Sequence, residues 1–132
     1  ALQGNYAGGA PYLVSPFAGL RRILGPAHAI SVAPGCGISG LNATGIAAAV
    51  RVASAAQTTI VAVGLDGTQE GEAHDRVSID LPGLQAKLIA AVASAAAQNG
   101  GRVIFADALP RNAMGKVQKK ALRDQYSKHF TG

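Results

Sequence analysis

The feature that most constrains the fold is TTIVAVGLD, residues 58–66. This stretch is rich in β-branched residues and apolar on both faces, as strands buried in parallel sheets are. After a polar loop, the stretch LPGLQAKLIAAVASAAAQ (81–98) has the composition of a helix, and Gly100 and Gly101 mark its end. A strand followed by a crossover helix is the repeating unit of a parallel α/β fold.

The remainder of the chain continues this alternation. Short apolar runs at 29–33 and 102–107 predict two more strands. Three further helices are predicted, over 15–24 with Ser15 as the cap, over 42–56 with Asn42 as the cap, and over 117–130 as a basic amphipathic helix. Together these elements predict an α/β fold, a three-layer sandwich with a short, mainly parallel sheet.

The carboxylates are gathered in one loop. Five of the seven acidic residues lie within residues 64–80, and the first 65 residues contain none. The loop follows the strand predicted over 58–66, and loops at the carboxyl ends of parallel strands are where such folds place their chemistry. Carboxylates held close together raise one another's pKa, so one can carry a proton while another stays ionised. The loop is therefore the candidate site.

Charge and cysteine content bound the remaining functions. The net charge is +5, and seven of the twelve basic residues lie between residues 102 and 132. This favours a solvated basic helix over a nucleic-acid or anionic-membrane contact. No apolar run reaches the length of a membrane span, and the N-terminus lacks the order of a signal peptide. Cys36 is the single cysteine, which excludes an internal disulfide and is interpreted as a small buried hydrophobe.

The segment GLDGTQEGEAHDR, followed by LPGLQAKLIAAVA, resembles the second, α/β-sandwich domain of family 3 glycoside hydrolases, and within that family its β-xylosidase branch. ALQGNYAGG, the SPFAGLRRIL helix and APGC are similar to further stretches of the same domain. The resemblance runs in order over residues 1–98. Ala73 departs from it, because glycine is common there.

The resemblance implies a retaining hydrolase in which one carboxylate attacks the sugar and a second acts as acid and then base. Glu72 would be the acid/base. Asp75, Arg76 and Glu70 would orient it or bind sugar hydroxyls. The family's nucleophile lies in a barrel domain, which needs about 200 residues or more, and this chain does not hold one. We therefore expect a carbohydrate-related chain that lacks activity alone, needs a missing catalytic domain or partner protein, and uses no cofactor or metal.

After residue 100 a second resemblance begins. RVIFADALPRNAMGKVQKKALRDQY is similar to the C-terminal end of acyl-CoA synthetases, over residues 101–130, and it would place their adenylation lysine at Lys116. This divides the chain into a partial hydrolase-like sandwich over 1–100 and a synthetase-like strand, loop and helix over 101–132, packed on the same sheet. The first resemblance points outside the cell and the second inside, so the compartment is left open.

Three alternatives stay open. GCGISG (35–40) has the glycine spacing of a dinucleotide-binding turn, although Asp66 lies farther on than that fingerprint requires. His74 could join the acids as a metal ligand, but no second His or Cys stands at a ligand spacing. The third alternative is a non-catalytic subunit that packs into a larger assembly, for which small-residue helices and a basic terminal helix are suited.

Overall fold

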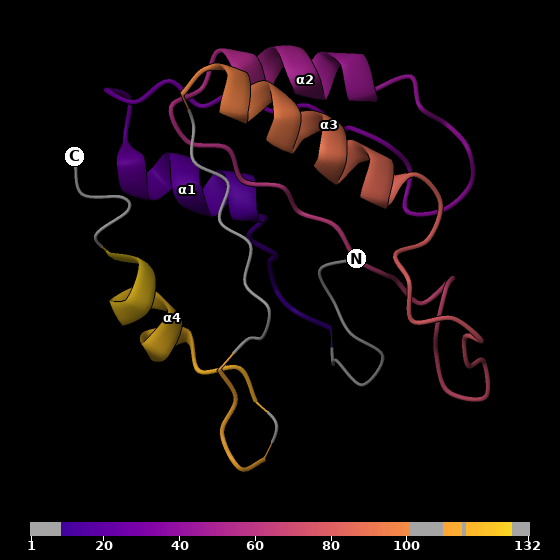
Figure 1. Ribbon diagram of the computed structural model, residues 1–132. Coiled ribbons are helices and arrows are strands. Elements are labelled where there is room, and N and C mark those ends of the chain that lie inside the picture. The colour runs from indigo at the N-terminus through magenta and orange to yellow at the C-terminus, as the bar shows by residue number, and fades with distance from the viewer. Residues whose placement is uncertain (1–8, 101–109, 115, 128–132) are drawn as a thin grey trace.

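The structure, a computed structural model, describes residues 9–100, 110–114 and 116–127. Within them the chain forms four helices: α1 (Pro16–Leu24), α2 (Ile46–Ser54), α3 (Gln85–Gln98) and α4 (Lys119–Tyr126) (Figure 1). All four were expected from the sequence, each with shorter bounds at one end or both. The strand predicted over 102–107 and the last residues of the helix predicted over 117–130 lie outside the described residues.

The starts of α1 and α2 differ in whether the local sequence correctly predicted the capping residue. At α1 the Ser15 hydroxyl accepts a hydrogen bond from the Ala18 N–H at 3.2 Å, which confirms the predicted cap. At α2 the predicted cap is wrong, because Gly45 precedes the first helical residue. Asn42 instead accepts hydrogen bonds from the N–H and the hydroxyl of Thr44, at 3.0 and 2.8 Å, and forms a turn ahead of the helix.

The core lies between α2 and α3, the only two helices in contact within the described part of the chain. They lie side by side along the upper edge of Figure 1. Four buried side chains form this core: Ala53, Leu88, Val92 and Ala95. Partly buried residues pack against it: Cys36, Ile46, Ala49 and Val50. Cys36 was expected to be a small buried hydrophobe; it packs on the core as such a residue, but it is only half-buried. The many alanines allow the two helices to approach closely, but they bury little area.

The predicted three-layer sandwich with a parallel sheet is wrong for the described residues, which hold four helices and no strand. Residues 29–33 and 58–66 run extended, yet they form no ladder with one another. Most of their side chains are exposed, Val32 at 63% and Ile60 at 70%. The sequence pattern of a β-branched apolar run does not show whether the run pairs with another strand, because pairing depends on a distant segment. The described residues contain only isolated bridges, such as Gly35 with Gly45.

Glycines let the loop before α2 approach the start of α3. Gly35 has a φ of +76°, and a Cβ there would lie 2.7 Å from the Leu88 side chain. Gly83, with a φ of +61°, passes Gly40 so closely that a Cβ would lie 2.7 Å from the Gly40 carbonyl oxygen. Of the glycines of GCGISG, Gly35 is thus explained by packing and Gly40 by its φ of +78°, which leaves the dinucleotide-binding alternative without its main support.

None of the described helices has the length and apolar character that crossing a membrane requires.

Candidate functional site

The candidate site is the acidic loop, residues 66–80, which extends away from the helix pair at the lower right of Figure 1. It begins with a turn organised by Asp66. The Asp66 carboxylate accepts hydrogen bonds from the Thr68 hydroxyl at 2.6 Å and from the Thr68 N–H at 2.9 Å. The pKa of Asp66 is held below its ordinary value, first by the hydroxyl bond and then by the N–H bond. Asp66 is therefore an ionised structural residue of the loop.

Glu72 lies at the tip of a tight turn. The N–H and carbonyl groups of Gly71 and His74 bond reciprocally, both at 3.0 Å, so Glu72 and Ala73 are the two central residues. Ala73 has a φ of +59°, the only positive value among the described non-glycine residues. This left-handed conformation is one that glycine adopts freely and alanine does not. The tight turn holds Glu72 outward, and its side chain is exposed.

Arg76 ties the two ends of the acidic loop together. Its Nε donates to a Glu70 carboxylate oxygen at 2.9 Å, and a terminal nitrogen donates to the Asp80 carbonyl oxygen at 2.8 Å. The ion pair of this guanidinium is with Glu70, six residues away, and not with the adjacent Asp75. Arg76 is 21% exposed and Glu70 52%, so this ion pair sits at the surface. It shapes the loop more than it stabilises the fold.

The acidic loop brings Glu70, Glu72 and Asp75 within one short segment, but it does not enclose them. Glu70, Glu72, His74 and Asp75 are all exposed. A carboxylic acid acts as a proton donor at neutral pH when a low-dielectric surrounding raises its pKa. Such a surrounding has to come from a surface that covers the loop. No three His, Cys, Asp or Glu side chains within the described ranges lie close enough to hold a metal ion, His74 included.

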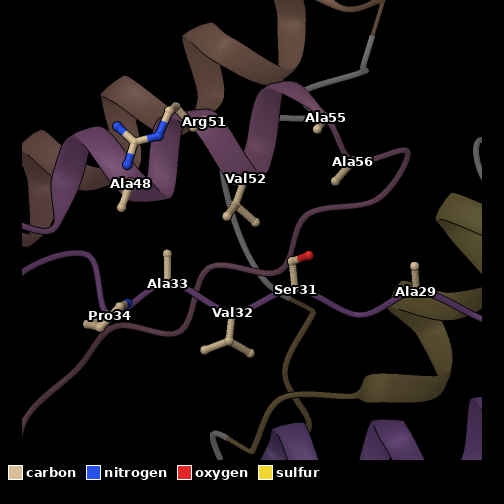
Figure 2. A pocket seen from close by; sticks show the side chains of 10 residues that line it. All are labelled: Ala29, Ser31, Val32, Ala33, Pro34, Ala48, Arg51, Val52, Ala55 and Ala56. Carbon is tan, nitrogen blue, oxygen red and sulfur yellow. The ribbon is translucent and has the colours of Figure 1, made fainter.

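The groove of Figure 2 lies apart from the acidic loop. It has a volume of about 390 Å³ and runs between the extended segment 29–34 and one side of α2. Ala48 and Val52 of α2, with Ala55 just after the helix, face Ala33 and Ser31 of the extended segment. Val32 points to the opposite side (Figure 2). The lining is apolar except for Ser31 and Arg51, so the groove offers packing surface and no group suited to acid–base chemistry.

Gln85 is a residue that the sequence analysis missed. It is 3% exposed, although its side chain is polar. Its amide oxygen accepts from the Gly64 N–H, and its amide nitrogen donates to the carbonyl oxygens of Gly64 and Ile38, all at 2.7 Å. Gln85 thereby fixes the point where the extended segment enters the acidic loop. One sequence signal could have identified Gln85: it is an amide residue among small and apolar residues at the start of a predicted helix, where a buried amide needs hydrogen-bond partners.

Lys116 lies in a separate hairpin between Arg111 and Val117. The Asn112 side-chain oxygen accepts from the backbone N–H groups of Met114 and Lys116, at 3.0 and 2.9 Å. Asn112 therefore shapes this hairpin as Asp66 shapes the start of the acidic loop. Lys116 is exposed, and its hairpin belongs to a different segment of the chain from Glu72.

The family model described as glycosyl hydrolase family 3 C-terminal domain matches residues 1–118. A probable exo-1,4-beta-xylosidase of Aspergillus niger is 41% identical over 118 residues, covering 84% of this chain and 14% of that protein. A probable exo-1,4-beta-xylosidase of Aspergillus japonicus is 38% identical over 122 residues, covering 92% of this chain and 14% of that protein. The chain thus spans about one seventh of the length of these relatives.

Proposed function

The chain belongs to the family of glycosyl hydrolase family 3 C-terminal domains, and we propose that it is the acid/base-bearing part of a β-xylosidase-like, retaining glycoside hydrolase. The supporting relatives are exo-xylosidases, matched over most of this chain. The match reaches residue 118, which is beyond the boundary near residue 100 expected from the sequence.

The observation that carries the proposal is the presentation of Glu72. Glu72 is one of the two central residues of the turn that Gly71 and His74 close, and its side chain is exposed. Glu72 and Asp75 are both exposed, and the family resemblance implies the acid/base role for Glu72. The ion pair between Arg76 and Glu70 shapes the loop around this turn. Asp75, Arg76 and Glu70 keep the proposed role of orienting Glu72 or binding sugar hydroxyls.

In the proposed reaction Glu72 starts protonated. It donates that proton to the glycosidic oxygen while a carboxylate nucleophile attacks the anomeric carbon, so the glycosidic bond breaks and a glycosyl ester forms. Glu72, now ionised, removes a proton from water. The water oxygen attacks the same carbon, the ester bond breaks, and the nucleophile is released as a carboxylate. The two carboxyl groups lie about 5–5.5 Å apart in such enzymes, and a barrel domain would supply the nucleophile and a surface that covers the acidic loop.

A loop exchange tests the proposal. Residues 64–81 would replace the corresponding segment of a complete Aspergillus exo-xylosidase, and turnover of an aryl β-xyloside would be measured. We expect an active chimera whose kcat falls by about 10²–10⁴-fold with Glu72→Gln. Azide, a nucleophile that needs no general base, should restore turnover of a substrate with a good leaving group. The matched control is Glu70→Gln in the same loop, expected to have the smaller effect.

Two results would contradict the proposal. One is a chimera in which Glu72→Gln leaves both kcat and its azide response unchanged. The other is turnover of the aryl β-xyloside by the 132-residue chain alone, abolished by Glu72→Gln, because this would mean that the chain carries its own nucleophile.

A second candidate function, a non-catalytic assembly subunit, is favoured by one observation. Large apolar side chains stay in solvent, among them Val77 at 107% and Ile79 at 98% exposed. These two belong to the acidic loop itself. A surface that packs against this loop would bury apolar area and at the same time enclose the carboxylates. Purification with a bound protein, together with no contribution of Glu72 in the chimera, would favour this function.

The synthetase-like interpretation of residues 101–130 is kept only as a minor alternative. The hairpin shaped by Asn112 presents Lys116 to solvent, as an adenylation lysine would need. The match to the hydrolase family continues through this hairpin, which supports a hydrolase origin for it. Loss of ATP-dependent acyl-adenylate formation in Lys116→Ala, measured on the full chain, would be the evidence for this alternative.

A further inference from the structure

The carboxyl end of α1 carries a hollow that the hydrolase function does not use. Its volume is about 570 Å³, and it is lined by Arg21, Arg22, Gly25, Pro26, His28 and Ile30. Two lining residues are cationic, one is a histidine, and none is acidic. This size is within the range of small-molecule sites and exceeds that of a single ion.

Within the residues that the structure describes, the positive charge of the hollow has no ion-pair partner. Residues 1–65 contain no carboxylate, so no neighbour in sequence can pair with Arg21 or Arg22. The structure records no ion pair for either guanidinium among the residues it describes. The helix end contributes about half a negative charge, against two full positive charges. Helix-dipole stabilisation therefore accounts for only part of this arrangement.

The floor of the hollow is held by hydrogen bonds. The Gly25 N–H donates to the Arg21 carbonyl oxygen at 3.1 Å, and Gly25 has a φ of +70°. His28 Nδ1 lies 2.8 Å from the Leu24 carbonyl oxygen. Because a carbonyl can only accept, Nδ1 carries the hydrogen, and Nε2 is left for a ligand. The chain after the helix is thus fixed, and the histidine ring is oriented.

We propose that this hollow binds an oxyanion carried on a sugar-sized molecule, with Arg21 and Arg22 holding the oxyanion. A planar guanidinium matches the geometry of a carboxylate or a phosphate and can bond it through two N–H groups. His28 Nε2 contacts a ligand hydroxyl group. Gly25 and Pro26 provide a surface without side-chain donors, and Ile30 provides the apolar contact that a sugar ring uses. The site is separate from the acidic loop and does not depend on the proposed hydrolysis.

The test uses the full chain and four probes: glucuronate, glucose 6-phosphate, glucose and inorganic phosphate. Binding is followed by the NMR shifts of the Gly25, His28 and Ile30 amides at 150 mM salt. We expect one or both charged sugars to shift these signals and glucose to leave them unchanged. Loss of one charge-assisted contact weakens binding about tenfold, so Arg21→Gln and Arg22→Gln should each do so. The matched control Arg51→Gln, in the groove of Figure 2, should leave binding unchanged.

The two charged probes separate the sources of the oxyanion. Binding of glucuronate alone identifies a carboxylated sugar, and binding of glucose 6-phosphate alone identifies a phosphorylated one. The proposal is overturned if neither binds, if glucose binds equally well, or if inorganic phosphate binds as tightly as the sugar phosphate. It is also overturned if Arg51→Gln weakens binding as much as Arg21→Gln. Replacement of both arginines by Lys, which preserves charge and helix propensity, should retain part of the affinity.

Discussion

The α2–α3 pair and the acidic loop use their side chains in opposite ways. In the pair, Leu88, Val92 and Ala95 are no more than 6% exposed, and small residues bring two backbones together. In the loop, Val77 and Ile79 are fully in solvent, and order comes from hydrogen bonds between polar groups. One region is held by burial and the other by local polar contacts. The chemistry proposed for this chain lies entirely in the second.

Gln85 connects the two regions. It is the first residue of α3, and it bonds both backbone groups of Gly64 just ahead of the acidic loop. The carboxylates thus depend on the helix pair for their position, but the helix pair does not depend on them. The loop can therefore change shape, or be covered by another surface, without unfolding the core.

The largest effect is expected from Leu88→Ala. Leu88 is 6% exposed, and it contacts the other core residues. Truncating a buried leucine costs about 2–5 kcal/mol, which in a core of this size removes much of the stability. Denaturant unfolding followed by circular dichroism measures the loss. The control is Leu41→Ala, at 85% exposure, where a change within about 0.5 kcal/mol is expected. Equal losses would mean that the helix pair is not the core.

A smaller loss is expected from Gln85→Leu. The leucine keeps the side chain buried but leaves the Gly64 N–H and two carbonyl oxygens without this partner. An unsatisfied buried group costs about 1–3 kcal/mol. Amide hydrogen exchange should accelerate more at Gly64 than within α3. This would show that the link between the acidic loop and α3 opens before the helix does. Gln98→Leu, at the exposed end of α3, is the control and should change neither measurement.

Ala73→Gly should act on the acidic loop alone. Glycine removes the cost of the left-handed conformation, about 1–2 kcal/mol, and part of that gain is offset because glycine gains freedom in the unfolded chain. We expect slower amide exchange at His74, whose N–H closes the turn, and no shift in global unfolding. If the free energy of global unfolding rises by as much as the free energy of opening at His74, the loop and the helix pair form one cooperative unit and do not open separately.

The smallest effect is expected on the pH dependence of the turn at Asp66. The pKa of Asp66 is lowered, so the Thr68 contacts that stabilise its turn are complete above the ordinary value of 3.8 and are lost as the pH falls through the lowered pKa. Thr68→Val removes the hydroxyl donor, and the pKa of Asp66 should move back up toward 3.8. Carboxyl carbon NMR measures this shift. No movement would mean that the backbone N–H alone holds the carboxylate.

The helices were predictable because their determinants are local. Ser15 and Pro16 define the start of α1, and Gly100, with a φ of +74°, follows the cap residue Asn99 at the end of α3. The acidic loop was identified from charge alone, and its turn at Ala73 coincides with the one position where the family resemblance favours glycine. These features depend on neighbours within a few residues, which a sequence displays directly.

The rest depended on contacts between distant residues. Whether residues 58–66 pair as a strand is decided by segments far along the chain, and the apolar pattern of Ile60 and Val61 cannot report this. Gln85 bonds a residue 47 positions away, a partner that no local pattern specifies. Arg76 reaches past its neighbour Asp75 to Glu70 because the intervening turn reverses the chain. The contacts that the sequence analysis missed all depend on turns of the backbone that bring separated residues together.

The position of the acidic loop between α2 and α3 determines how a glutamate-specific protease would divide the chain. The chain contains only two glutamates, Glu70 and Glu72, and both are exposed in this loop. A protease that cleaves after glutamate would therefore nick the molecule in one place, leaving α1 and α2 on one fragment and α3 and α4 on the other. Two pieces that still migrate together after such a cut would owe their attachment to the interface between α2 and α3.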